Sequence, residues 1–261
     1  MLFPNNLSAS NNIDTVVSRF AIHALSIGSY PIFHYAVPAR MAIYRYTFYK
    51  SPNIGIFVKA NDTLVIVPHG FAETKAEKLA DYLQVKEVHA SVADTRLLGP
   101  MTVMNNNGIL LPSIASDEEV EAIQRASGLS VERLKSRLTA IGNLIAANDN
   151  GAVISPLLGD EVGRQVQDVL GVPAHTMGVG GFVQSGSMIV ATNVGAAVTP
   201  RASEEEVKAV SEILQVPAEP VTVNGGMPFL SSGIVANSKS VVVGTLTSGP
   251  ELIMMSRVFN A

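Results

Sequence analysis

Five short apolar runs recur along the chain, and each of them follows a polar turn that contains an asparagine. The pairs are Asn61 before LVIVP, Asn105 before GILLP, Asn148 before GAVISP, Asn193 before GAAVTP and Asn237 before VVVG. The asparagines are 44, 43, 45 and 44 residues apart, and another apolar run precedes each turn. Asparagine, aspartate and glycine accept the backbone of tight turns, so each pair of runs predicts a β-hairpin. The regular period indicates one structural unit that is repeated five times.

A helix signal follows four of the five hairpins. It is the capping box, in which a hydroxyl and a carboxylate three residues later satisfy backbone N–H groups at a helix start. The four boxes are Thr74 with Glu77, Ser116 with Glu119, Ser203 with Glu206 and Ser248 with Glu251, and the third unit lacks one. The segments that follow place apolar residues at helical spacing, which predicts amphipathic helices with an acidic outer face.

A further short strand is expected after each of the first four helices, at 88–92, 135–139, 174–179 and 221–224. The chain ends after the fifth helix, but an apolar segment at 44–48 has the same offset before Asn61 as 88–92 has before Asn105. We therefore expect a strand within 42–50 to complete the fifth unit and to close a ring, because closure pairs strand edges that are otherwise exposed.

The expected architecture is a single α/β domain over 41–261, built as a closed ring of five units. The approximate repeats are 53–94, 95–139, 140–181, 182–226 and 227–261. Residues 1–40 stand outside the repeat and match neither a membrane span nor a signal peptide with a basic start. We expect a disordered tail, or upstream sequence before a start at Met41, with an ordered accessory segment as the alternative.

Composition narrows the possible chemistry. The chain has no cysteine and a net charge of −4, and its five histidines are scattered without the spacing of metal ligands. Disulfides, thiolate metal sites and cysteine nucleophiles are excluded, and no metal or other cofactor is expected. Nucleic-acid affinity rests largely on clustered Lys and Arg, so an acidic chain favours a protein partner with a basic surface.

Several segments of the repeat resemble the translation initiation factor 6 family, the ribosome anti-association factors of archaea and eukaryotes. They are NIGIFVKAND at 53–62, NNNGILLPSIASDEE at 105–119, LTAIGNLIAANDNGAVISP at 138–156 and SSGIVANSKSVVVG at 231–244. The resemblance runs from about residue 42 to the C-terminus. Because the chain stops after the fifth helix, it is similar to the archaeal form, which has no C-terminal tail.

The resemblance implies a pentein fold, a closed five-bladed pseudosymmetric α/β propeller with repeats of about 44 residues. It also implies a non-enzymatic cytoplasmic monomer that acts in translation initiation and ribosome biogenesis. Family members bind the intersubunit face of the large ribosomal subunit, mainly through a ribosomal protein near the sarcin-ricin loop, with a possible minor rRNA contact. The bound factor prevents the small subunit from joining.

Matching positions suggest the ribosome-binding residues, which are Gly55, Arg96, Gly99, Gly142 and Asn143. The glycines are equally expected from turn geometry, because they recur with the repeat. Arg96 and Asn143 break the repeat and are the stronger candidates. Eukaryotic members often have a basic residue where this chain has Pro100, so a salt bridge there is not expected.

Two other functions compete with the ribosomal one. Some pentein proteins are guanidine-modifying enzymes, but their cysteine nucleophile has no counterpart in a chain without cysteine. The second alternative is a pentein-fold scaffold that binds a different protein. Sedimentation with large and small ribosomal subunits separates that scaffold from a ribosome-binding factor.

Overall fold

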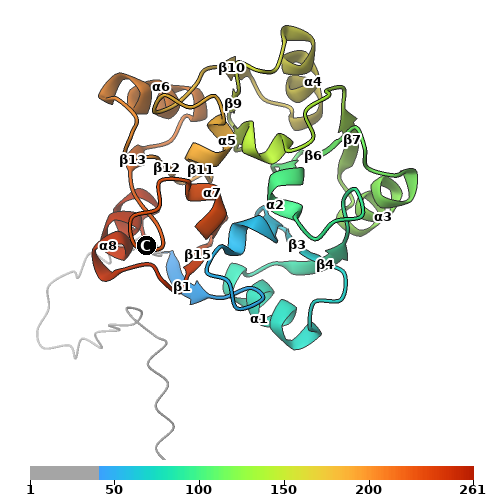
Figure 1. Ribbon diagram of the computed structural model, residues 1–261, viewed down its shortest axis with the longest axis horizontal. Coiled ribbons are helices and arrows are strands. Elements are labelled where there is room, and N and C mark those ends of the chain that lie inside the picture. The colour runs from blue at the N-terminus through green and yellow to red at the C-terminus, as the bar shows by residue number, and fades with distance from the viewer. Residues whose placement is uncertain (1–40) are drawn as a thin grey trace, which may run out of the picture.

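The computed structural model describes residues 41–261, and the expectation for 1–40 lies outside the described residues. Figure 1 shows five units around a central axis, with the strands toward the inside and one longer helix of each unit on the outer rim. Each unit has its own three-stranded sheet, so the described chain is mixed α/β with five small sheets.

Every sheet has an inner, a central and an outer strand. The inner strands are β2 (Lys59–Ala60), β5 (Val103–Met104), β8 (Ile145–Ala147), β11 (Ile189–Ala191) and β14 (Ile234–Ala236). The central strands are β3 (Leu64–Pro68), β6 (Gly108–Pro112), β9 (Ala152–Ile154), β12 (Ala196–Val198) and β15 (Ser240–Gly244). The outer strands are β4 (Lys86–Ala90), β7 (Ser130–Leu134), β10 (Ala174–Thr176), β13 (Ala218–Pro220) and β1 (Ala42–Tyr46).

Two sets of helices complete the units. The rim helices are α1 (Glu73–Leu83), α3 (Asp117–Ser127), α4 (Asp160–Leu170), α6 (Glu204–Leu214) and α8 (Gly249–Val258). The short helices, which precede the inner strands, are η1 (Ile54–Ile56), α2 (Leu98–Met101), η2 (Ile141–Asn143), α5 (Ser185–Met188) and α7 (Leu230–Gly233). The short helices lie close to the axis in Figure 1.

The five predicted hairpins are confirmed, because each inner strand pairs antiparallel with the central strand of its unit. One turn residue was assigned wrongly. In the other units the repeat asparagine accepts backbone N–H bonds through its Oδ1 atom, as Asn61 does from Leu64. In the fourth unit the Thr192 hydroxyl accepts the corresponding bond from Gly195, and Asn193 is one position further on. A threonine hydroxyl can accept the same bonds as an asparagine side chain. The alignment of the repeats on asparagine therefore placed the fourth turn one residue too late.

The predicted third strands fall in the right part of each unit, but their positions differ. Strand β4 begins two residues before the expected segment 88–92, and β10 covers only the first half of 174–179. The prediction of a strand at 135–139 was wrong, because the strand of that unit is β7 at Ser130–Leu134. The prediction at 221–224 was also wrong, because β13 ends at Pro220. Both missed strands are outermost in their sheets. Outer strands tolerate charged residues and proline, so they give a weak sequence signal.

Three of the four predicted capping boxes are present, at Ser116, Ser203 and Ser248. The prediction for Thr74 was wrong, because α1 begins at Glu73 with Ala72 as its N-cap. The third unit lacks a box as predicted, and Gly159 precedes its helix.

The ring is closed by its N-terminal strand, as predicted. Strand β1 pairs parallel with β15, from Ala42 opposite Ser240 to Tyr46 opposite Gly244. This pairing covers an edge of β15 that would otherwise be exposed. The hydrophobic cores also join neighbouring units. One of them packs Phe48 of the closing segment with Leu79 of α1 and with Val242 of the fifth unit.

Candidate binding surface

The repeat gives the ring two different ends. The first, which we call the hairpin face, consists of the turns 61–63, 105–107, 148–150, 192–194 and 237–239 and the C-termini of the rim helices. Hydrogen bonds hold these parts together, since Asn105 Nδ2 donates to the carbonyl of Leu170 at the end of α4 at 2.8 Å. Asn237 makes the equivalent bond to Leu83 at the end of α1.

The opposite end, which we call the loop face, consists of two sets of linking segments. Those between outer strands and short helices are 47–53, 91–97, 135–140, 177–184 and 221–229. Those between central strands and rim helices are 69–72, 113–116, 155–159, 199–203 and 245–248. Because central and outer strands run parallel, both kinds of link leave the sheet at the same end.

The hairpin face uses its polar groups internally. Around the axis, the residue after each turn-capping position donates its backbone N–H to a side-chain oxygen of the next unit. Asp62 donates to Asn106, Asn106 to Asp149, Asp149 to Asn193, Asn193 to Ser238 and Ser238 back to Asp62. The circle passes through all five units, so these side chains form a polar plate that fastens the ring at this end.

The three predicted glycines lie together near the loop face. Gly55, Gly99 and Gly142 are buried in the short helices η1, α2 and η2. A Cβ atom on Gly99 would overlap the Gly55 carbonyl oxygen, and one on Gly142 would overlap the Gly99 carbonyl oxygen. Glycine is therefore required at these positions for close approach of neighbouring units. Contact of these glycines with a ribosome stays a prediction.

Arg96 and Asn143 lie at the same end of the molecule as the glycines. Arg96 is exposed in the link before α2, and its guanidinium lies 5.9 Å from the centre of the Tyr49 ring. Asn143 is the last residue of η2 and is partly buried. Its side-chain amide makes no hydrogen bond within the described residues 41–261. Both side chains are thus available to a partner that approaches the loop face.

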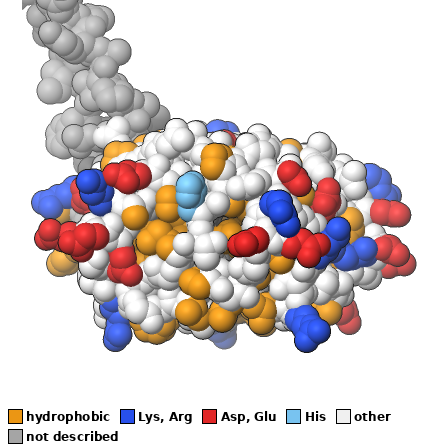
Figure 2. All heavy atoms as spheres, turned by 90° about the horizontal axis from the view of Figure 1, so that it is seen from above, with side chains coloured by type: hydrophobic (Ala, Val, Ile, Leu, Met, Phe, Trp, Pro, Cys, Tyr) orange, Lys and Arg blue, Asp and Glu red, His pale blue; other side chains and the backbone are white. Residues whose placement is uncertain are grey.

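Exposed apolar side chains gather on the loop face, which the sequence analysis did not predict. Ten large hydrophobic residues are exposed in the described chain, and all except Ile253 on α8 belong to the loop-face links. The nine are Tyr49, Leu97, Ile114, Leu138, Leu157, Val183, Met227, Phe229 and Leu246. Figure 2 views the ring from its edge and shows hydrophobic side chains at the surface, interspersed with charged ones. Large exposed apolar surfaces are typical of interaction sites.

The loop-face links also differ in charge from the chain as a whole. They contain five basic residues, Lys50, Arg96, Lys135, Arg137 and Arg201, and one acidic residue, Asp94. The links therefore sum to +4, whereas the chain sums to −4. The acidic residues of this end stand at the starts of the rim helices, where the helix dipole favours them. The links themselves are therefore basic and apolar, and acidic first turns of the rim helices stand beside them.

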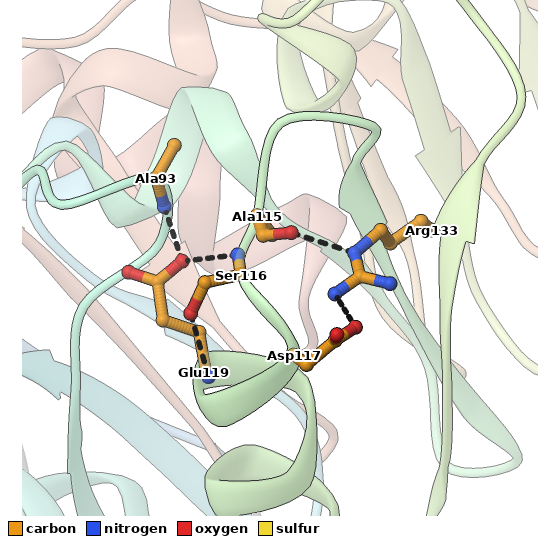
Figure 3. A network of polar contacts seen from close by, with 6 residues as sticks. All are labelled: Ala93, Ala115, Ser116, Asp117, Glu119 and Arg133. Atoms are coloured by element: carbon orange, nitrogen blue, oxygen red, sulfur yellow. Dashed lines mark hydrogen bonds and ion pairs between the residues drawn. The ribbon is translucent and has the colours of Figure 1, made fainter.

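The capping glutamates hold the loop-face links in place. Figure 3 shows Glu119 at the start of α3 between its own helix and the turn that follows β4. Its carboxylate accepts hydrogen bonds from the backbone N–H groups of Ala93 and Asp94 at 2.8 and 2.9 Å and from Ser116 at 3.0 Å. Burial opposes ionisation, but these bonds outweigh it and lower the pKa of Glu119. Glu206 and Glu251 contact the turns of their neighbours in the same way.

An ion pair supports the same corner of the second unit. Arg133 on β7 donates to the Asp117 carboxylate at 2.5 Å and to the carbonyl of Ala115 at 2.6 Å, as Figure 3 shows.

Within residues 41–261 no group of three His, Asp or Glu side chains is placed to hold a metal ion. In the same part of the chain, no helix is long and apolar enough to cross a bilayer.

Comparisons of the sequence with known proteins identify the family to which it is similar. The model of the eIF-6 family matches residues 43–258. The chain is 53% identical to translation initiation factor 6 of Nitrosopumilus maritimus over 219 residues, which are 84% of this chain and 99% of that protein. It is 51% identical to the factor of Cenarchaeum symbiosum over 219 residues, with the same coverage. It is 42% identical to the factor of Pyrococcus furiosus over 218 residues, 82% of this chain and 96% of that protein.

Proposed function

Because the chain belongs to the eIF-6 family, we propose that it binds the intersubunit face of the large ribosomal subunit and sterically prevents the small subunit from joining. It acts without catalysis in translation initiation and ribosome biogenesis, as a cytoplasmic monomer. The five sheets of similar construction support assignment to the pentein fold. The observation that carries the proposal is the concentration of exposed apolar side chains on the loop face.

A closed ring suits a steric mechanism. The polar plate at one end and the packed glycines at the other restrain neighbouring units against relative movement. Such a body can block a surface through its volume alone, provided that it is held tightly by one face. Stable protein interfaces bury roughly 800 Å² per partner and place aromatic and arginine residues at their centre. The loop face offers Tyr49, Phe229 and Arg96 for this purpose.

The proposed binding residues divide into two kinds. Arg96 and Asn143 contact the ribosome through their side chains, since both have accessible surface at the loop face. Gly55, Gly99 and Gly142 act by holding the short helices that present those side chains. Their substitution therefore weakens ribosome binding through the shape of the surface.

The side chains of the loop face suit a partner that contains both protein and RNA. Its apolar side chains fit a protein surface, and we assign them to a ribosomal protein near the sarcin-ricin loop. Its five basic residues permit an additional, minor contact with rRNA phosphates. A pentein scaffold for another protein would use the same apolar surface, so binding to ribosomal subunits is the discriminating test.

The test is co-sedimentation of the full chain with purified large or small ribosomal subunits. We expect co-migration with the large subunit only, and a reduced yield of joined subunits when the chain is present. Arg96→Glu and Leu97→Ser remove contacts of the loop face. Arg125→Glu is the matched control, because it makes the same charge change at an exposed site in the last turn of α3, at the hairpin face.

The outcomes separate the alternatives. Binding that is weakened in both loop-face variants and unchanged in Arg125→Glu supports the proposal. If the wild-type chain stays at the top of the gradient with both subunits, the ribosomal function is wrong and the scaffold alternative replaces it. If Arg125→Glu alone loses binding, the function stands but the binding face is the opposite one.

A further inference from the structure

A cavity of about 60 Å³ lies inside the ring. Its lining includes the glycines of the short helices toward the loop face, among them Gly55, Gly99 and Gly186. Toward the hairpin face it is bounded by a collar of mainly small residues, Ala60, Met104, Ala147, Ala191 and Ala236, which separates it from the polar plate. A water molecule needs at least about 10 Å³ of such volume, so the cavity can hold several waters or one small ion.

The wall of the cavity is more polar than its side chains suggest. All five inner strands are edge strands, each paired on one side only. Their other side faces the axis, where inner strands of neighbouring units approach one another without forming a common sheet. The N–H and C=O groups on this axial side of the strands therefore border the cavity. Buried backbone groups need a hydrogen-bond partner, so the wall favours a polar occupant.

One charged residue lines this space. Among the described residues, Lys59 on β2 is the only charged one in the lining of the cavity. The register of the hairpins places it opposite Ile66, and the equivalent positions of the other units hold Val103, Ala146, Val190 and Val235. The lysine thus breaks an otherwise apolar position of the repeat. Packing alone does not explain an ammonium group there, because an apolar side chain fills the same position four times.

The Lys59 ammonium has no carboxylate partner among the described residues, whose two ion pairs both lie elsewhere on the surface. The nearest acids in its own hairpin are in the polar plate, where the Asp62 carboxylate accepts hydrogen bonds from Asn106, Asn193 and Ser238. Burial lowers the pKa of Lys59 to about 8, with no contribution from a neighbouring charge. Lys59 is partly buried, and a partly desolvated charge without a partner is unfavourable, so a mobile counter-ion stabilises it.

We propose that the central cavity binds one small inorganic anion, of the size of chloride or phosphate, between the Lys59 ammonium and backbone N–H groups of the inner strands. The volume excludes organic ligands of metabolite size, and the single positive charge selects against cations. The anion neutralises Lys59 and connects inner strands of several units. It therefore stabilises the closed ring, since any ligand that binds only the folded chain raises its stability.

The test compares thermal unfolding of the full chain in sodium chloride, sodium phosphate and sodium gluconate at equal ionic strength. Gluconate is too large for the cavity and serves as the reference anion. At about ten times the dissociation constant, binding is expected to raise the melting temperature by about 3–6 °C. The two inorganic salts distinguish chloride from phosphate as the preferred ion. Phosphate also stabilises proteins by exclusion from their surface, so only differences between variants are informative.

Two substitutions complete the experiment. Lys59→Met should abolish the anion-specific shift and raise the melting temperature in gluconate, because it removes a partly buried charge that has no partner. Lys208→Met removes the same charge from the surface of α6, where Lys208 lies 3.8 Å from Glu212, and should keep the shift. An equal response of the wild type to chloride, phosphate and gluconate overturns the proposal, and so does an anion-specific response that survives Lys59→Met.

A direct observation covers the case in which Lys59→Met does not fold. Crystals of the wild-type chain grown with bromide should show an anomalous peak within hydrogen-bonding distance of Lys59 Nζ. A cavity without such a peak contradicts the proposal for halides, and a phosphate soak tests the larger ion in the same way. Ribosome binding plays no part in these measurements, so they can fail or succeed independently of the proposed function.

Discussion

The two faces of the ring arise from the same repeat but use their polar and apolar groups in opposite ways. On the hairpin face, Asp62, Asn106 and Asp149 bond to one another around the axis. On the loop face, Leu97, Phe229 and Leu246 are exposed, and the links carry a surplus of basic residues. A repeat protein can thus fasten itself at one end and leave the other end for a partner. Substitutions at the two ends should therefore separate stability from binding.

The largest expected effect comes from removing the closing strand. Deletion of residues 1–47 removes β1, exposes the edge of β15 and takes Tyr46 out of the core shared with the fifth unit. We expect loss of cooperative unfolding or a fall in melting temperature of more than about 10 °C, equivalent to several kcal/mol. Circular dichroism during heating measures this. A chain shortened only to Met41 keeps every described contact and is the control; equal melting of the two chains would refute closure by β1.

The next effect concerns the packed glycines. It distinguishes residues that hold the short helices in place from residues that contact the ribosome. In Gly99→Ala, the new methyl group overlaps the Gly55 backbone, which cannot move as a flexible side chain could. We expect a loss of about 3 kcal/mol or more in the free energy of unfolding, measured with urea. The control is Gly249→Ala, because a Cβ atom there meets no neighbour within 4 Å. Unchanged stability of Gly99→Ala with lost ribosome binding would instead make this glycine a direct contact.

An acid-sensitive contact links the helix starts to the loop face. Burial opposes ionisation of Glu251, but hydrogen bonds from Ser248, Gly226 and Thr222 together outweigh it and lower the pKa to about 2. Since the folded pKa lies below the unfolded value, this carboxylate stabilises the fold above about pH 4.5, and the contribution is lost as the pH falls toward 2. Glu251→Gln should cost about 2–3 kcal/mol at pH 7 and little at pH 2. Urea unfolding at both pH values measures this, and an equal cost at both contradicts it.

The smallest effects on stability are expected on the loop face itself. Arg96→Glu and Asn143→Asp should change the free energy of unfolding by less than about 0.5 kcal/mol, because neither side chain is fully buried. Their affinity for the large subunit should fall by about 5–30-fold, which corresponds to about 1–2 kcal/mol at an interface. Titration with a fluorescently labelled chain measures the affinity. Two variants with wild-type affinity would remove these residues from the interface.

Local signals in the sequence predicted much of the fold. The hairpin turns and the boxes at Ser116, Ser203 and Ser248 are set by residues close in the chain, so their motifs could be recognised. The fourth turn was misread because Thr192 replaces asparagine as the acceptor. Strand β7 was missed because Glu132 and Arg133 interrupt its apolar pattern at the outer position of a sheet.

The site was harder to predict than the fold. Motif matching proposed Arg96 and Asn143 as ribosome-binding residues; both lie at the loop face, and their contact with a ribosome stays a prediction. The exposed apolar side chains were not found, because Ile114, Leu157 and Leu246 look like ordinary loop residues until the ring brings their links to one end. The position of Lys59 has the same origin, since only closure turns an edge strand toward an internal cavity.

The most direct test of the binding face uses the absence of cysteine from the chain. A single thiol can be introduced by Leu97→Cys on the loop face or by Lys239→Cys on the hairpin face, both in exposed surroundings. The rate of maleimide labelling is then measured with and without saturating large ribosomal subunits. We predict strong protection of the thiol at position 97 and none at position 239. Protection at position 239 alone would contradict the assignment of the loop face as the surface that binds the ribosome.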